Sequence, residues 1–138
     1  MIRHESINIP FKYAAGQAGS AVLLALRDEG RILAARCTAC DRVSAPARAF
    51  CPACGSGHVE YVEVGPGGEL LAWTERPGKG LYGLVKLDGA ASAVLHRLLC
   101  SPDEAVVGSR FEARFATQRR GHILDIEGFV PQGPEQGE

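Results

Sequence analysis

Hydrophobic and polar residues divide the sequence into a short helical segment near its N-terminus and a long region of alternating segments. The stretch AVLLALRDE, from Ala21 to Glu29, is apolar on nearly every side at its start. Ser20 is placed to cap a helix there, and Gly30 follows directly after its end. Because a helix that is apolar all round is normally buried, we expect residues 1–35 to form a helical lead-in that packs against the barrel predicted below or against another chain.

From His58 onward the pattern changes to the period of two that is typical of β-strands. Segments such as HVEYVEV, ELLAWTE and RFEARFATQ alternate apolar and polar residues, and the Asp88–Gly89 pair marks a tight turn between two further segments. Five short strands in residues 59–130 predict a small closed barrel of the OB type. Residues 131–138 are rich in Pro, Gly and Glu and are expected to form a loose tail.

Four of the five cysteines stand close together in CTACDRVSAPARAFCPACG, residues 37–55. They form two Cys-x-x-Cys pairs, in which two intervening residues let both sulfurs point at one metal ion from a tight turn. Asp41 follows the first pair and Gly55 the second, and both residue types tolerate the unusual backbone angles of such a turn. The spacing predicts a rubredoxin-like zinc ribbon over residues 36–58, with the ligands Cys37, Cys40, Cys51 and Cys54.

Four thiolates complete the tetrahedral shell of an ion and leave no position for substrate, so the site is expected to be structural. Zinc is the predicted metal, and iron in a rubredoxin-like site is the alternative. Two disulfides or four free thiols are the further possibilities for these cysteines. Metal binding is expected to supply most of the folding energy of the ribbon, while the barrel is expected to have a separate core.

The overall composition argues against several classes of protein. The chain has 138 residues with a net charge of −1, 46% hydrophobic residues and 22% charged residues, which is the balance of an ordinary folded domain. No apolar run approaches the length of a membrane span, and the N-terminus lacks the apolar core of a signal peptide. A cytoplasmic location is therefore expected, where thiols stay reduced and paired cysteines more often bind metal.

The other residues with reactive or charged side chains are scattered, and no catalytic residue is predicted. Cys100 is interpreted as an ordinary apolar residue, and a catalytic pairing with His96 has little geometric support. Asp125 and Glu127 are interpreted as a solvated acidic pair. Three arginines flank the cysteine turns, where they can offset the negative charge of a zinc bound by four thiolates or bind an anion. These arginines are Arg36, Arg42 and Arg48.

The order of these parts resembles a family of small subunits that join a rubredoxin-like zinc ribbon to an OB fold and accompany thiolases and related acyl-CoA enzymes. The resemblance rests on ALRDEGRILAARC, CTAC…PARAFCPACGS, GGELLAWT, LYGLVKLDG and EAVVGSRFEARF, and it covers residues 22–130. Two departures are Asp41, where the family usually has Gly, and Ala45–Pro46, where it often has Pro-Pro. Neither departure removes a metal ligand.

The resemblance implies a non-catalytic subunit that binds a thiolase-fold subunit in a hetero-oligomer and helps shape its acyl-CoA site. The lead-in IPFKYAAGQAG is similar to that of members accompanying thiolases of anaerobic aromatic degradation, which cleave aryl-succinyl-CoA thioesters. In such a complex the helix would offer Val22, Leu23 and Leu26 to the partner. The phosphates of coenzyme A would suit basic contacts, for which the candidates are Arg36, Arg42, Arg48, Arg76 and Lys79.

The alternative function is that of an OB-fold protein that binds single-stranded nucleic acid. Such barrels use aromatic side chains on a basic face, whereas aromatics make up only 7% of this chain and its net charge is slightly negative. Arg119 and Arg120 give one local basic pair. The composition therefore favours the accessory subunit over the nucleic-acid binder.

Overall fold

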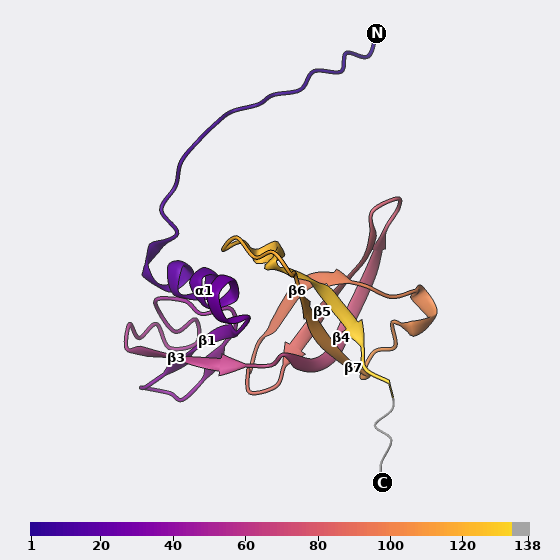
Figure 1. Cartoon of the computed structure of the whole chain (residues 1–138). Coiled ribbons are helices and arrows are strands. Elements are labelled where there is room, and N and C mark those ends of the chain that lie inside the picture. The colour runs from indigo at the N-terminus through magenta and orange to yellow at the C-terminus, as the bar shows by residue number, and fades with distance from the viewer. Residues whose placement is uncertain (134–138) are drawn as a thin grey trace.

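The computed structural model describes residues 1–133, which form an α-helix, a three-stranded sheet and a closed five-stranded barrel (Figure 1). The helix and strands are α1 (Gly16–Glu29), β1 (Ile32–Cys37), β2 (Val43–Ser44), β3 (Val59–Val64), β4 (Gly67–Arg76), β5 (Gly80–Leu87), β6 (Ala93–Leu98), β7 (Arg110–Phe115) and β8 (Ile126–Pro131). Short 3₁₀ turns, Pro102–Glu104 and Ile123–Asp125, precede β7 and β8. The strand order is β2–β1–β3 in the sheet and β4–β5–β6–β8–β7 in the barrel. This mainly β architecture, with helix, ribbon and barrel in that order, confirms the predicted fold class.

Helix α1 begins earlier than the sequence predicts and ends where it predicts. The helix starts at Gly16, so Ser20 lies inside it, and Ala15 at its N-terminus makes no capping bond through its side chain. The predicted Ser20 cap is therefore wrong, because the small residues before it continue the helix. At the other end Gly30 adopts the left-handed conformation, with φ 62°, and its N–H bonds to the carbonyls of Ala25 and Leu26 in the last turns of the helix.

Strand β3 belongs to the ribbon and not to the barrel. It runs antiparallel to β1, with Val64 opposite Ile32 and Val62 opposite Ala34, while β2 pairs with the other edge of β1. The predicted ribbon of residues 36–58 is therefore too short at both ends, because its strands begin at Ile32 and end at Val64. Alternation in the segment indicates a strand, but it does not say which strand pairs with it.

The barrel is a meander of β4, β5 and β6 that β7 and β8 close. Strand β4 pairs with both β5 and β7, and the closing pair between β6 and β8 is parallel, with Leu98 opposite Phe129. Gly89 has φ 89° in the predicted turn between β5 and β6. Gly68 permits the close approach of β4 to β5, because a Cβ there would lie 2.5 Å from the carbonyl oxygen of Lys86.

Helix, ribbon and barrel share one hydrophobic core. Leu26 of α1 and Ala34 of β1 belong to the same cluster of buried residues as Leu70, Phe111 and Phe129 of the barrel. Hydrogen bonds also join ribbon and barrel, from Ala91 N–H to Val43 O, from Ala45 N–H to Ser92 Oγ and from Gly65 N–H to Asp88 O. The expectation of a separate barrel core is therefore wrong, because the ribbon strands contribute their buried side chains to the same core.

The last strand extends into the segment that was predicted to be a loose tail. Pro131 lies opposite Phe111 in β8, and the N–H of Gln132 bonds to the carbonyl of Arg110. The tail prediction for residues 131–138 is therefore corrected at its start, and residues 134–138 lie outside the described residues. Over residues 1–133, no helix is both long and apolar enough to span a bilayer.

Candidate metal centre

The two Cys-x-x-Cys pairs fold into turns with the same hydrogen-bond pattern. The N–H of Cys37 bonds to the carbonyl of Arg42, and the N–H of Asp41 bonds back to the carbonyl of Cys37, at 2.9 and 2.8 Å. The equivalent bonds of the second turn run from Cys51 N–H to Ser56 O and from Gly55 N–H to Cys51 O, at 2.8 and 2.9 Å. Each turn is thus closed by its own backbone before any ion is considered.

Asp41 and Gly55 occupy equivalent positions, directly after the second cysteine of each turn. Both have positive φ, 67° for Asp41 and 76° for Gly55. This left-handed conformation favours Gly and is tolerated by Asp, so the expectation for both residues is confirmed. The Asp41 carboxylate also accepts a hydrogen bond from Arg36, which ties the first turn to β1.

The four cysteine sulfurs converge between the two turns. All four lie within 4.8 Å of one another, and the Sγ–Sγ distances are 3.6 Å both for Cys37 and Cys54 and for Cys40 and Cys51. Four sulfurs at about 2.3 Å from a tetrahedral zinc would be about 3.8 Å apart, so the cluster has the size of a metal site. None of these four cysteines forms a disulfide within residues 1–133, which disfavours the disulfide alternative.

The backbone of each turn stabilises one sulfur as a thiolate, the form that binds metal. The N–H groups of Cys54 and Ala53 lower the pKa of the Cys51 thiol to about 6. The N–H of Cys40 lowers the pKa of Cys37 in the same way. The N–H of Arg42 also acts to lower the pKa of Cys40, but the Cys51 sulfur and burial outweigh it and raise that pKa to about 12. The protein alone therefore favours the metal-binding thiolate form of two of the four cysteines, Cys37 and Cys51.

The donor set fits an ion that accepts four sulfur ligands in a tetrahedron, which zinc and iron both do. Because the protein supplies all four positions, none remains for a substrate. The ion would hold the two turns together at the end of the ribbon. The chemistry that the residues support at this site is therefore structural.

The basic residues near the ribbon differ in how available they are to an anion. Arg36 forms ion pairs with the carboxylates of Asp41 and Glu60. Arg42 and Arg48 are exposed. Arg48 also lines a cavity of about 330 Å³, whose other walls are mainly apolar side chains of α1, the ribbon and the barrel.

The other two basic candidates lie elsewhere. Arg76 and Lys79 belong to the β4–β5 hairpin, whose tip projects from the side of the barrel that faces away from the ribbon (Figure 1). The Arg76 guanidinium lies 5.7 Å from the centre of the Tyr82 ring, a distance at which a cation and an aromatic face attract. The structure thus separates the five candidates into a ribbon group and a hairpin group.

Two of the three side chains predicted to dock a partner are buried inside this chain. Val22 is 6% exposed and Leu26 1%, and Leu23 is partly buried against the same core. The outward-facing residue of this stretch is Leu24, which is 45% exposed. The predicted docking surface is therefore corrected, because the ribbon and barrel of this chain cover the inner face of the helix.

Cys100 and His96 have the environments of structural residues. Burial lowers the pKa of His96 and raises the pKa of Cys100. The Nδ1 atom of His96 accepts a hydrogen bond from the N–H of Arg97 at 2.8 Å, and its ring packs edge-on against Phe129. Because only the thiolate is a good nucleophile, a raised pKa does not favour catalysis at Cys100.

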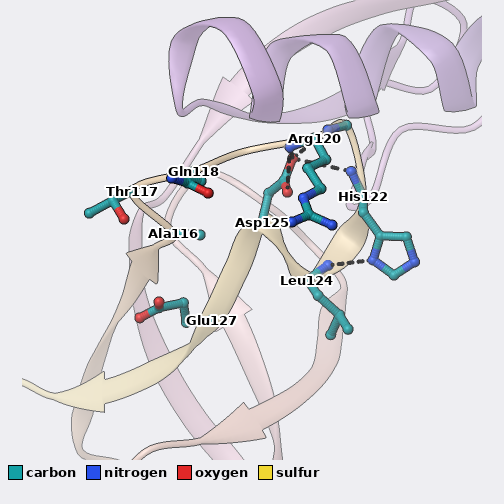
Figure 2. Close-up of a pocket in the computed structure, with 9 residues that line it drawn as sticks. Ala116, Thr117, Gln118, Arg120, His122, Leu124, Asp125 and Glu127 are labelled. Carbon is teal, nitrogen blue, oxygen red and sulfur yellow. Dashed lines mark hydrogen bonds between the residues drawn. The ribbon is translucent and has the colours of Figure 1, made fainter.

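A buried carboxylate that the sequence analysis misses organises the loop before β8. Asp125 is only 3% exposed, and it accepts hydrogen bonds from the backbone N–H groups of Arg120, Gly121 and His122 at 2.7–3.1 Å (Figure 2). The interpretation of Asp125 as a solvated residue is therefore wrong, because these N–H groups replace water. Glu127 is exposed, as expected, and pairs with Arg114.

The loop that Asp125 organises lies against helix α1, which crosses above it in Figure 2. The Nε atom of Arg119 donates to the carbonyl of Arg27 at 3.0 Å. The Nδ1 atom of His122 accepts a hydrogen bond from the N–H of Leu124, so His122 and Asp125 form a capping box. The spacing His-x-x-Asp before an apolar strand is the signal that could have found this anchor.

An open pocket of about 630 Å³ lies beside this loop. Its charged and polar lining includes Gln118, Arg120 and His122 and also the carboxylate of Glu127 (Figure 2). Charges of both signs line it, so the pocket does not indicate one class of ligand. We interpret it as the outer surface of the loop between β7 and β8, which packs against α1.

Comparisons with known proteins agree with this geometry. Residues 25–60 match the sequence model of the ChsH2 rubredoxin-like zinc ribbon domain. This match includes all four clustered cysteines and ends at Glu60, the second residue of β3. A search of curated proteins finds no match to the chain.

Two solved structures are similar to the chain over most of its length. One is the Ltp2–ChsH2(DUF35) aldolase, with 20% identity, a TM-score of 0.59, and coverage of 86% of this chain and 98% of that chain. The other is a DUF35-family protein of unknown function from Sulfolobus solfataricus, with 18% identity, a TM-score of 0.59, and coverage of 84% of this chain and 82% of that chain. At these identities the likeness shows a shared fold. Residues 25–60 are therefore similar to the ChsH2 zinc ribbon, and the chain shares the fold of the two DUF35 structures.

Proposed function

We propose that this chain is a non-catalytic, zinc-binding subunit that assembles with a thiolase-fold subunit and helps shape its acyl-CoA site. The observation that carries the proposal is the ChsH2-type ribbon on a chain whose fold matches the DUF35 component of an enzyme assembly. The closed set of four thiolates supports a structural role for the metal, with zinc as the ion. The nucleic-acid alternative is not favoured by these comparisons.

The partner surface is proposed to use apolar side chains that the fold leaves exposed. On the barrel, Leu84 of β5 lies opposite Leu95 of β6, and the two are 40% and 68% exposed. On the ribbon, Phe50 is 52% exposed, and Leu24 projects from the outer side of α1. Large apolar side chains that lie next to one another on a surface mark sites where proteins associate.

The contact with coenzyme A is proposed to involve the ribbon group of basic residues first. Arg48 combines an exposed position with a place in the wall of the apolar cavity of about 330 Å³, so it could bind a phosphate while apolar walls face the remainder of the cofactor. Arg42 is a second exposed cation on the ribbon. Arg76 and Lys79 would contribute only if the cofactor, or the partner that holds it, also reaches the hairpin.

The most specific part of the proposal concerns the substrate of the complex and its location in the cell. We propose an aryl-succinyl-CoA thioester of anaerobic aromatic degradation as the substrate of the complex, on the resemblance of the lead-in. A cytoplasmic location is proposed because four thiolates require reducing conditions to remain available to a metal.

Co-purification with the intact chain from its native source, with identification of the bound protein by mass spectrometry, tests the proposed function. We expect a thiolase-fold acyl-CoA enzyme in stoichiometric amount and one zinc per small chain. In the purified complex, Arg48→Ala should raise the KM for the acyl-CoA, whereas Arg114→Ala on β7 should not. Recovery of a different class of protein, or salt-dependent binding of single-stranded nucleic acid in place of a protein partner, would overturn the proposal.

A further inference from the structure

The N-terminal arm, which we define as residues 1–13, carries an apolar face that lies uncovered within residues 1–133. The arm forms neither helix nor strand, and in Figure 1 it runs away from the body of the molecule. Its apolar face consists of Ile7, Ile9, Phe11 and Tyr13, each between 69% and 84% exposed. Single exposed apolar residues are ordinary, but four large ones in one segment indicate a surface that another molecule covers.

The spacing of these residues is that of a β-strand. The four apolar residues alternate with Asn8, Pro10 and Lys12, so in an extended chain they would all point to the same side. The rings of Phe11 and Tyr13 lie near each other, with centroids 6.0 Å apart, which agrees with a shared face. The arm thus has the pattern of a strand with one buried face, although it pairs with no strand within residues 1–133.

Pro10 determines which edge of such a strand could pair. In a strand the N–H and C=O groups of successive residues point to opposite edges. Pro10 has no N–H, and proline is tolerated in sheets where that edge faces solvent. The pairing edge is therefore the one formed by Ile7, Ile9, Phe11 and Tyr13, and the arm would become the new outer strand of the sheet it joins.

A second copy of this chain offers only short or charged strand edges within its described residues. Strand β4 pairs with β7 only over Gly67–Glu69, and the outer part of β4, which pairs with β5 alone, ends in the charged residues Glu75 and Arg76. Strand β2 at one side of the ribbon sheet is only two residues long. The free edge at the other side is β3, where Glu60 and Glu63 are already paired with Arg36 and Arg31. Charged residues on an edge strand disfavour the addition of another strand. These edges favour a different protein as the occupant.

The size of the apolar face fits a stable complex. Buried Phe and Tyr side chains each cover about 150–250 Å², so the arm with its two isoleucines supplies on the order of 600 Å². A standard complex buries roughly 800 Å² on each partner. The arm alone therefore supplies most of the area that one partner needs.

We propose that the N-terminal arm adds as an edge strand to an open β-sheet of the partner subunit, with its apolar face in a groove beside that edge. Main-chain hydrogen bonds would provide affinity and the alternate side chains specificity, as in other cases of strand addition. This inference rests on the proposed function in one respect, that the chain works in a hetero-oligomer. The experiment below can nevertheless contradict the role of the arm without contradicting the proposed function.

The test uses the full-length chain and the partner subunit that co-purification identifies, produced and purified by itself. Ile9→Asp, on the apolar face, should weaken binding by about tenfold or more, and the matched variant Asn8→Asp, on the opposite face, should bind within about threefold of the native chain. Ile9→Pro removes an N–H from the pairing edge and should also weaken binding. Asn8→Pro removes one from the outer edge and should not. Zinc content and thermal unfolding should be unchanged in all four variants, because the arm lies outside the folded body.

Hydrogen exchange adds a readout that does not depend on substitutions. In the complex the amides of Ile7, Ile9, Phe11 and Tyr13 should exchange slowly, while those of Asn8 and Lys12 should exchange as fast as in the isolated chain. Such alternation is a property of a strand that is paired on one edge only. Uniform protection or uniform rapid exchange along the arm would overturn the proposed mode of binding.

The possible outcomes separate this proposal from the proposed function. Native affinity in both Ile9 variants overturns the role of the arm, while a thiolase-fold partner still supports the proposed function. A partner of another class that requires the arm overturns only the proposed function, and the absence of any stoichiometric partner overturns both. A dimer of the isolated chain that Ile9→Asp converts to a monomer would show that a second copy is the occupant, and would overturn the proposal.

Discussion

Asp125 shows how a single residue can organise the contact between the helix and the barrel. Burial by itself would raise the pKa of its carboxyl, but the N–H groups of Arg120, His122 and Gly121 outweigh this effect and hold the pKa below its ordinary value. Backbone N–H groups that donate to a carboxylate favour its ionised form. The charge of Asp125 therefore helps keep the loop beside α1 in place.

Asp125→Asn is expected to lower the free energy of unfolding by about 1–3 kcal/mol, because the amide replaces one accepting oxygen by a donor that faces N–H groups. Since the folded pKa of Asp125 is lowered, its contribution is fully present above the unfolded pKa of about 3.9 and is lost as the pH falls through the folded pKa. The stability difference between native chain and variant should therefore be constant above about pH 5 and shrink below about pH 4. Urea unfolding across this pH range measures it.

Glu127→Gln is the matched control for this prediction, since Glu127 lies nearby in β8 and forms an exposed ion pair with Arg114. Exposed ion pairs contribute little to the free energy of unfolding, so this variant should change that free energy by no more than about 0.5 kcal/mol. Equal effects of the two substitutions at neutral pH would show that Asp125 does not anchor the loop.

At the scale of elements, α1 divides its apolar residues between two roles. Its inner residues, which include Val22 and Leu26, pack on the ribbon and the barrel, while Leu24 remains exposed. The helix is apolar on more sides than its own chain covers. The inner residues therefore stabilise the fold, and the outer residue is available to the proposed partner.

Leu26→Ala should lower the free energy of unfolding by about 2–5 kcal/mol, because it leaves a cavity at a residue that is 1% exposed. Leu24→Ala removes the same atoms from a residue that is 45% exposed, and it should change stability by about 0.5 kcal/mol or less. Chemical denaturation compares the two variants. A large loss of stability in Leu24→Ala, or none in Leu26→Ala, would contradict this assignment of the two faces.

At the scale of the whole molecule, the shared core leads us to expect that the metal site and the barrel are energetically coupled. The cysteine turns lie at the end of strands that contribute to the single core, and the ribbon is hydrogen-bonded to the β5–β6 connection through Val43 and Ala45. When the ion is lost, the protein loses the stabilising free energy that a structural zinc contributes to folding. Because the core is shared, this loss should reach the barrel.

Removal of zinc by a chelator is expected to lower the Tm of the barrel by more than about 5 °C, with recovery when zinc is restored. Trp73 of β4 is the single tryptophan of the chain, so its fluorescence reports on the barrel, while a chromogenic indicator reports the released metal. Cys51→Ser should show the same lowered transition without chelator. A Trp73 transition that stays unchanged in both experiments would show that the barrel folds independently of the ribbon.

The sequence by itself determined the elements whose geometry depends on neighbouring residues. The two cysteine turns follow from the two-residue spacing and from Asp41 and Gly55, since each turn is closed by hydrogen bonds within a few residues. Gly30 ends the helix for the same local reason. The alternating segments were predictable as strands, because the period of two is a property of the extended chain.

The tertiary structure alone decided which faces are covered and which strands pair. The alternation of Val59–Val64 suits either sheet, and only the pairing with β1 places it in the ribbon. Asp125 is buried because a loop folds over it, and Val22 and Leu26 are buried because distant strands lie beneath them. The hydrophobic pattern of a segment indicates which side each residue faces. Whether that side is buried depends on residues far along the chain, or on another protein, that pack against it.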